Sequence, residues 1–332
     1  MHDSSDYSQI IWQTRLLKFD LTRRGIVMGI LNVTPDSFSD GGLFSDPHDA
    51  LAHAQEMIAH GAEIIDVGGE STRPGAEPVE ESKELRRVLP IIGQLAKLPG
   101  HGEKFVISID TMKPSVARAA MEAGASIIND VSGLRDIAMI EAAKDTRAGV
   151  VVMHMQGGPQ TMQSAPHYAD VCGDVRDFFC QRLNALVASG VAASSIVFDP
   201  GIGFGKTPEH NLALLRRMDD IALAPHPIAV GVSRKSFIGK VLAREGTQAS
   251  SLCCKRASSL HENASMQARC TQAAQPGMAV FHDPGISATD DRMWPTVALT
   301  CHAREHGARI FRVHDVKPNV EALRMTEAIL GE

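Results

Sequence analysis

The sequence predicts a single α/β domain with the architecture of a (β/α)₈ TIM barrel, and two observations support this. Eight short apolar runs with strand character alternate with amphipathic runs with helix character. The strand-like runs are largely continuous in apolar residues, which is typical of parallel strands buried on both faces. Eight such units suit a closed barrel better than an open sheet.

The expected strands and helices follow one another along most of the chain. Several helix-like stretches end in the glycine expected just past a helix C-terminus, as at Gly61, Gly124 and Gly190. We expect a lead-in over 1–24 and the barrel over 25–331. The expected strands are 26–32, 63–67, 105–110, 126–130, 149–155, 195–200, 227–233 and 309–315.

One irregular segment, 244–292, interrupts this pattern between the seventh and eighth strands. It is rich in Ala, Ser and Gln and has poor periodicity. A long surface insertion costs little closure entropy, so an insertion that the fold tolerates is one explanation. A misread or frameshifted stretch of coding sequence is the other.

The composition excludes several classes of protein. The chain has 332 residues, a formal net charge of −6 and a pI of about 6.2, so no basic field draws it to nucleic acid or an anionic membrane. No signal peptide precedes the first strand and no apolar run is long enough to span a bilayer, so we expect a cytoplasmic protein without membrane contact. The 6 cysteines show no zinc-type spacing, and we expect them to be reduced and structural.

Polar residues end the expected strands, and in a barrel these ends converge on the face where active sites lie. A single such residue is explained as the cap of the following helix, but a ring of them favours a site. His154 is more simply explained as a packed core residue. The strand-end residues are Asn32, Asp66, Asp110, Asn129, Asp130, His154, Asp199, Ser233, His314 and Asp315.

The stretch PGIGFGKT, at 200–207, comes close to a phosphate-binding P-loop without matching it. The pattern requires glycine where Pro200 stands. Pro208 disfavours helical geometry at Thr207, so the next helix is expected to begin too late for Thr207 to hold magnesium. The sequence therefore argues against a nucleotide triphosphatase.

Three strand-end residues, Asp110, Asn129 and Asp199, are expected to face one spot in the barrel mouth. Unpaired buried acceptors would cost about 1–3 kcal/mol each, so the edge of a flat heterocycle with adjacent N–H and NH₂ groups is a suitable partner. The alternative for each residue is a helix cap or a charge pair with Lys235.

Basic residues gather near the last two strands. SRKSFIGK places Ser233, Arg234 and Lys235 at the start of a helix, whose N-terminus attracts anions. RVHD brings Arg312 and His314 beside them. Strand eight borders strand one, so an anion with its metal ion would fit next to Asn32.

These motifs together resemble the dihydropteroate synthase family. The similarity covers roughly 25–243 and 293–331, in order and on the expected strands. The segments that carry it are GILNVTPDSFSDGG, GAEIIDVGGESTRPGA, SIDT, INDVSG, VMHMQG, FDPGIGFGK, VSRKSFIG and FRVHDV.

The resemblance implies a reaction and a set of site residues. The family condenses 4-aminobenzoate with hydroxymethyl-dihydropterin pyrophosphate, usually with Mg²⁺, commonly as a homodimer, and is a sulfonamide target. The implied catalytic residues are Asp110, Lys235, Arg312 and His314. The implied pterin site comprises Asp110, Asn129, Met153, Asp199, Phe204 and Lys235; the pyrophosphate and metal site Asn32, Thr72, Arg73, Arg312 and His314; and the aminobenzoate site Phe38, Pro74 and Ser233.

The expected mechanism needs no strong general base. Loss of pyrophosphate leaves a cation that the pterin delocalises, so the protein stabilises the leaving anion and holds the nucleophile. The loop over 33–43, rich in Asp, Ser and Gly, has the composition of a lid that screens this cation.

The sequence leaves two alternatives to an active synthase. One is a pterin-binding protein without synthase activity, in which the segment 244–292 or altered loops prevent 4-aminobenzoate binding. The other is a pterin-dependent methyltransferase, which would not need the basic SRK and RVHD residues.

Overall fold

The computed structural model describes residues 9–34, 47–72, 75–158, 161–163, 166–243 and 292–332, and its centre is a closed parallel barrel. Each of its eight strands pairs with two neighbours, and closure occurs where β10 pairs with both β9 and β3. This confirms the predicted barrel. The strands are β3 (Ile26–Asn32), β4 (Ile64–Gly68), β5 (Val106–Asp110), β6 (Ile127–Asp130), β7 (Gly149–Met153), β8 (Ile196–Asp199), β9 (Ile228–Val230) and β10 (Ala308–Val313).

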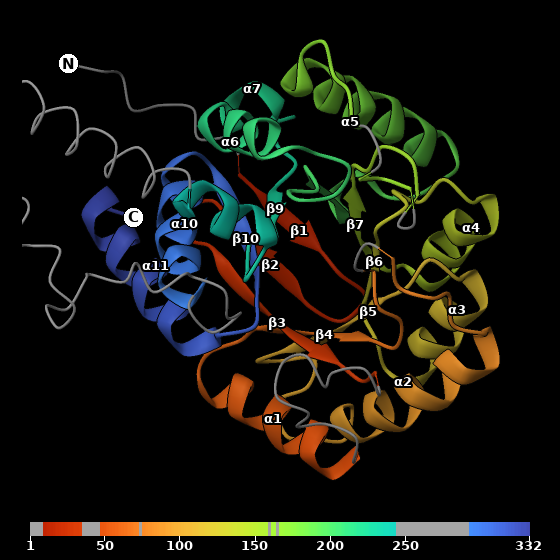
Figure 1. The fold of residues 1–332 in the computed structure, drawn as a ribbon. Coiled ribbons are helices and arrows are strands. Elements are labelled where there is room, and N and C mark those ends of the chain that lie inside the picture. The colour runs from red at the N-terminus through yellow and green to blue at the C-terminus, as the bar shows by residue number, and fades with distance from the viewer. Residues whose placement is uncertain (1–8, 35–46, 73–74, 159–160, 164–165, 244–291) are drawn as a thin grey trace, which may run out of the picture.

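Helices form a ring outside the strands, as Figure 1 shows. Several have the expected end signals: Asp136 and Asp170 cap α4 and α5, and Gly124 follows α3 with a positive φ of 124°. The helices are α1 (Pro47–Ala59), α2 (Glu81–Leu95), α3 (Pro114–Ala123), α4 (Ile137–Thr146), α5 (Val171–Ala188), α6 (Pro208–Arg216), α7 (Met218–Ile221), α10 (Met293–Glu305) and α11 (Val316–Leu330), with a 3₁₀ turn η2 (Ala193–Ser195) and helical residues 236–243.

Two hydrophobic clusters hold the barrel together. The larger one lies between strands and helices, because strands such as β4 and β5 are buried at every position. The smaller one fills the barrel interior at its N-terminal end with Met28, Ile64, Val106 and neighbouring strand residues. Both faces of the strands are therefore apolar, which explains their continuous hydrophobic sequences.

An N-terminal hairpin closes the bottom of the barrel. Strands β1 (Ile11–Gln13) and β2 (Lys18–Asp20) pair antiparallel, and Trp12, Phe19 and Leu21 pack into the interior cluster. Trp12 is completely buried, and its Nε1 donates to the carbonyl of Ser195 at 2.9 Å. The sequence predicts only a lead-in over 1–24, whereas these residues include the hairpin that closes the barrel.

Other parts of the chain bear on the remaining expectations. Segment 244–291 and most of the loop after β3 lie outside the described residues. Within the described ranges, the free cysteines are Cys172, Cys180 and Cys301. No helix among the described residues combines the length and apolarity needed to cross a membrane.

Candidate active site

The carboxyl ends of β3 to β6 place polar side chains at one level of the barrel. The strand register aligns Asn32 with Gly68, Gly68 with Asp110 and Asp110 with Asn129. A Cβ atom at Gly68 would lie 3.5 Å from Asn32 Oδ1 and 3.6 Å from Asp110 Cβ. The glycine therefore leaves the space between Asn32 and Asp110 open.

Arg312 on β10 connects this level to a buried carboxylate. Its Nε donates to Asp66 Oδ2 at 2.6 Å, and its Nη2 donates to Asp110 Oδ2 at 2.6 Å. Asn129 Nδ2 donates to the same Asp66 oxygen at 3.1 Å. From sequence Asp66 is only a strand-end residue, but here it holds together Arg312, expected to bind the anion, and Asn129, expected to bind the ring.

Two carboxylate oxygens at this site lack partners among the described residues. They are Asp66 Oδ1 and Asp110 Oδ1, and both are buried. A buried acceptor without a donor costs about 1–3 kcal/mol, so a ligand that brings N–H groups would recover this free energy. The site can therefore bind the donor edge of a polar ring.

Asp199 and Lys235 form the opposite side of the mouth. Asp199 Oδ1 accepts from the Gly201 backbone N–H at 2.7 Å. Gly201 has a φ of 65°, and a Cβ atom there would come within 2.0 Å of the His154 carbonyl oxygen, so only glycine fits this turn. Lys235 Nζ donates to the Ile202 carbonyl at 2.8 Å and lies 3.9 Å from the centre of the Phe204 ring.

Burial makes the charged forms of these groups costly. It raises the pKa of Asp110 to about 7, although Arg312 opposes the shift, and it also raises the pKa of Asp199. Burial lowers the pKa of Lys235 to about 7, although Asp199 favours its charge. Burial would lower the pKa of Arg312, but Asp66 and Asp110 raise it, so Arg312 stays charged. Asp110 and Lys235 thus have pKa values near neutrality, beside the charged guanidinium of Arg312.

Ser233 and His314 meet between β9 and β10. Ser233 Oγ accepts from the His314 backbone N–H at 3.1 Å and lies 3.0 Å from His314 Nδ1. Arg234 departs from the expectation of a basic cluster, because its Nε and Nη2 donate to Asp315 at 3.1 and 2.6 Å. The positive charge available at this rim is therefore smaller than the sequence suggests.

The PGIGFGKT turn has a structural role instead of a nucleotide-binding one. Thr207 is the N-cap of α6, Pro208 is its first residue, and the Thr207 hydroxyl accepts from the His210 N–H at 3.2 Å. Lys206 is buried and lies 3.0 Å from His154 Nδ1. Burial and Lys206 lower the pKa of His154 to about 3, so His154 is a neutral packed residue, as the sequence favours.

Met153 and Phe204 lie in a small apolar cluster near the mouth, separate from the two large ones. Its buried members are Val131, Met153, Met155 and Met162, with Met112 and Phe204 packed against them. The register pairs Met153 with Asp199, so this apolar surface adjoins the carboxylate. The combination of an apolar wall and polar edge groups is typical of a small-molecule site.

An ion-pair network that the sequence does not predict supports the loop after β4. Lys113 Nζ pairs with Glu70 and with the fully buried Glu84, at 2.5 Å in the second case. Glu84 also accepts from the Thr111 hydroxyl at 2.7 Å, and Glu70 accepts from the Val79 N–H at 3.2 Å. The network thus fixes both ends of the loop that carries Thr72.

The structure describes most, but not all, of the expected site residues. Thr72 is half-buried on the loop after β4, whereas Phe38, Arg73 and Pro74 lie outside the described residues, as does most of the expected lid over 33–43. The barrel brings the remaining expected residues to its C-terminal face. These are Asn32, Asp110, Asn129, Met153, Asp199, Phe204, Ser233, Lys235, Arg312 and His314.

Comparison with known proteins identifies the family. The family described as "Pterin binding enzyme" matches residues 28–278, which extends into the irregular segment. Dihydropteroate synthase of Escherichia coli K12 is 41% identical over 307 residues, covering 92% of each chain. The structure of Xanthomonas albilineans dihydropteroate synthase with 4-aminobenzoic acid has a TM-score of 0.76 at 34% identity, covering 98% of this chain and 100% of that one.

A second solved structure has similar coverage and contains 7,8-dihydropteroate. Burkholderia cenocepacia dihydropteroate synthase complexed with 7,8-dihydropteroate has a TM-score of 0.74 at 38% identity and covers 97% of each chain. At this sequence identity over nearly the whole length, the similarity shows a common family and not only a common fold. The chain belongs to the dihydropteroate synthase family of pterin-binding enzymes.

Proposed function

We propose that this chain is a transferase that condenses 4-aminobenzoate with 6-hydroxymethyl-7,8-dihydropterin pyrophosphate to give 7,8-dihydropteroate and pyrophosphate. The observation that carries the proposal is Asp110 Oδ1, which is buried and has no hydrogen-bond partner among the described residues, on a side chain next to the space that Gly68 leaves open. A pterin offers adjacent N–H and NH₂ donors on one edge, which match the carboxylates of the mouth.

The pterin is assigned to the polar mouth and its apolar wall. Asp110 and Asp199 accept from the ring edge, Asn129 bonds to it through its amide, and Lys235 donates to a ring acceptor. Lys235 must then exchange its hydrogen bond to the Ile202 carbonyl for one to the ligand. Met153 and Phe204 cover the ring, since they already form an apolar surface beside Asp199.

The diphosphate is assigned to Asn32, Arg312, His314, Thr72 and Arg73. The bond between the exocyclic methylene and the diphosphate oxygen breaks, and both electrons leave with pyrophosphate. Arg312 stabilises this anion because Asp66 and Asp110 keep it charged and oriented. The 4-aminobenzoate nitrogen then forms the new C–N bond and releases a proton to solvent, so no strong base is required.

A Mg²⁺ ion is assigned to the side of the mouth at Asn32. Asn32 Oδ1 faces the open space beside Gly68. An amide oxygen, together with phosphate oxygens and water, suits a hard cation. When bound, the ion would neutralise part of the diphosphate charge. Asn32 would hold it while Arg312 contacts the same anion.

The aminobenzoate site is assigned to Ser233, Phe38 and Pro74. Ser233 Oγ is held by the His314 backbone N–H, so it is fixed next to the diphosphate region. Sulfonamides resemble 4-aminobenzoate in shape and charge, so we expect them to compete at this position.

A homodimer in the cytoplasm completes the proposal. Trp294 on α10 and Met325 and Ile329 on α11 are 70%, 63% and 72% exposed, and the two helices pack side by side. Exposed large apolar residues on adjacent helices are suitable for burial against a second copy. Neither a membrane nor nucleic acid takes part in the reaction.

The deciding experiment measures pyrophosphate release by the purified full chain with the pterin diphosphate and Mg²⁺, with and without 4-aminobenzoate. Release that depends on 4-aminobenzoate, with dihydropteroate as product, is expected. Pterin binding without turnover would instead establish a binding protein. Methyl transfer from a reduced folate without pyrophosphate release would indicate the methyltransferase alternative.

The irregular segment can be tested separately in the same assay. Deletion of 245–291 from the full chain is expected to leave turnover within about threefold, because long surface insertions contribute little to folding free energy. Loss of activity in a folded deletion variant would contradict the interpretation of a tolerated insertion.

A further inference from the structure

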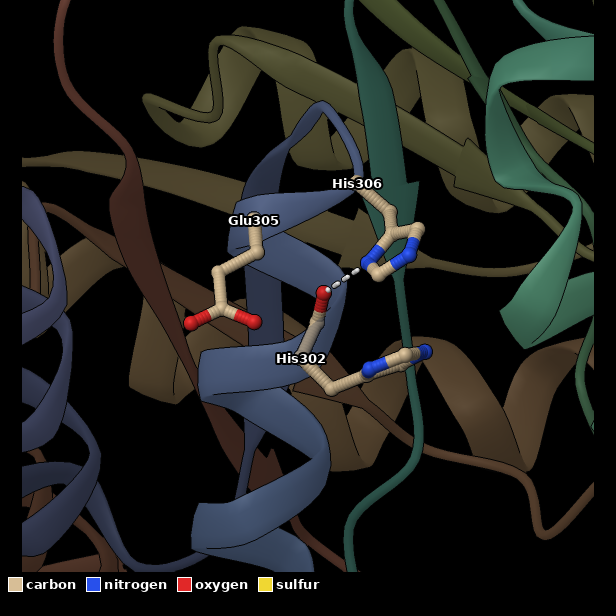
Figure 2. Close-up of side chains that lie close together, drawn as sticks. All are labelled: His302, Glu305 and His306. Carbon is tan, nitrogen blue, oxygen red and sulfur yellow. Dashed lines mark hydrogen bonds between the residues drawn. The ribbon is translucent and has the colours of Figure 1, made fainter. Parts of the chain in front are cut away.

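The last turn of α10 carries three metal-ligand side chains that the proposed reaction does not use. They are His302, Glu305 and His306, shown in Figure 2. One candidate ligand atom from each lies within 4.8 Å of the others. The i, i+3 and i+4 spacing brings the three side chains together on one side of the helix.

This cluster lies far from the barrel mouth. Helix α10 ends at Glu305, and β10 then runs from Ala308 to Val313 toward the site. The cluster therefore sits at the N-terminal end of the barrel, on the outside.

Hydrogen bonds to backbone carbonyls fix how both imidazoles are protonated when neutral. His302 Nε2 lies 3.1 Å from the Leu215 carbonyl oxygen, and His306 Nδ1 lies 2.8 Å from the His302 carbonyl oxygen. A carbonyl oxygen only accepts, so each of these nitrogens carries a hydrogen. In the neutral rings, His302 Nδ1 and His306 Nε2 then hold the lone pairs.

This arrangement matches the support that metal-binding histidines require. A ligating histidine commonly donates its other ring N–H to a backbone carbonyl, which sets the tautomer and the ring orientation. Here both histidines do so before any metal arrives. The two rings also lie against each other, with centroids 4.1 Å apart.

We propose that His302, Glu305 and His306 form a binding site for a divalent transition-metal ion of the Zn²⁺ class. Two imidazoles and one carboxylate suit Zn²⁺ and do not suit Mg²⁺, which prefers oxygen ligands. Zinc bonds of about 2.0–2.2 Å in a tetrahedron require closely spaced ligand atoms. The candidate atoms lie within 4.8 Å of one another, and the exposed Glu305 side chain can adjust its position to the ion.

A second carboxylate lies beside this turn. Asp219 Oδ1 on α7 would be 3.4 Å from a Cβ atom built on Gly307, the residue after His306. It adds negative potential next to the three ligands. Water completes the fourth position of the tetrahedron.

A bound ion would strengthen the contact between α10 and α6. Coordination of His302 Nδ1 polarises its Nε2–H, which donates to the carbonyl of Leu215 on α6. The ion would thereby stabilise the outer layer of the barrel just before β10.

The test is a titration of the metal-free full chain with Zn²⁺ by calorimetry, in excess Mg²⁺ and reducing agent. The expected result is one high-affinity equivalent that is absent from the His302→Gln/His306→Gln double variant. Glu305→Gln touches neither ring hydrogen bond and is expected to weaken binding about tenfold or more. Saturating Zn²⁺ should also raise Tm in the wild-type chain more than in the double variant.

His60→Gln is the matched control. His60 also stands four residues from a glutamate, at 4.0 Å from Glu56, but belongs to no such cluster among the described residues. The His60→Gln variant should still bind one equivalent of Zn²⁺ with the affinity of the wild type. Co²⁺ in place of Zn²⁺ should give the absorption of a tetrahedral site in wild type only. Equal stoichiometry and affinity in wild type, Glu305→Gln and the double variant would overturn the proposal.

Discussion

Asp66 and Arg312 are joined by a hydrogen bond of 2.6 Å between Oδ2 and Nε, although they lie 246 residues apart in the chain. The same Asp66 oxygen accepts from Asn129, and the same guanidinium donates to Asp110. Asp66 therefore positions Arg312 and Asn129 directly, and Asp110 through Arg312; the proposed function assigns all three to substrates.

Removing the charge of Asp66 is expected to impair the reaction without a direct loss of substrate contact. In Asp66→Asn, Arg312 loses one of its two carboxylates, and kcat/KM for the pterin diphosphate should fall about 10- to 100-fold. The rise in KM for this substrate should exceed any rise for 4-aminobenzoate. Asp220→Asn, which alters an exposed ion pair with Arg217, is the control and should change neither. Unchanged kinetics in a folded Asp66→Asn chain would refute this positioning role.

Two substitutions test the ring-binding residues directly. Lys235→Ala and Asp110→Ala should each reduce kcat/KM by about tenfold or more, which corresponds to about 1.4 kcal/mol of lost transition-state stabilisation. Steady-state rates and equilibrium pterin binding should be measured together, because both residues contact the ring in the proposal. Near-normal kcat/KM in both variants would remove their assigned roles.

The raised pKa of Asp110 predicts a specific pH dependence of stability. Between its ordinary pKa of 3.8 and about 7, the folded chain keeps a proton that the unfolded chain has released. The contribution of this proton is therefore lost as the pH rises through that range. Relative to Asp110→Asn, the free energy of unfolding of the wild type should fall by about 2–3 kcal/mol between pH 5 and 8. Urea unfolding of both proteins at pH 5 and at pH 8 measures this difference in the free energy of unfolding.

The comparison with Asp110→Asn isolates one group. Lys235 titrates in both proteins, so its opposite contribution cancels from the difference to first order. A difference in unfolding free energy that is constant from pH 5 to 8 would show that Asp110 is ionised throughout.

The network at Lys113 predicts a stability effect remote from the chemistry. Lys113→Met leaves Glu84 buried without its cation and should cost about 3 kcal/mol or more. Lys144→Met is the control, since its pair with Asp145, at 3.9 Å, is exposed and should cost below about 1 kcal/mol. Thermal unfolding of both variants gives the comparison. A Lys113→Met/Glu84→Gln double variant should recover part of the loss, because the buried charge is then gone.

The sequence predicts the barrel well because each strand and helix has its own local pattern. All eight expected strands overlap the observed ones, and the polar strand ends do converge on one face. The hairpin is missed because β1 and β2 have only three residues each, too short for a periodic signal. Only the barrel opening explains why Trp12 and Phe19 are buried.

The electrostatics of the site depend on contacts that local patterns do not contain. Arg234 stands in a basic run, but it pairs with Asp315, which lies 81 residues later between β10 and α11. Lys113 and Glu84 look like surface charges in an amphipathic pattern, yet they meet below the loop after β4. Such pairs cannot be predicted from local sequence, because the barrel topology brings their residues together.

The plug formed by β1 and β2 also constrains the order of events during synthesis. These residues emerge from the ribosome before any barrel strand, but their binding surface includes Ile310 on β10 and the Arg309 side chain, whose Nε donates to the Leu21 carbonyl at 2.8 Å. The surface is therefore incomplete until β10 has been made. Until then Trp12 remains in water, so the fluorescence of this indole should report the final closure of the nascent chain.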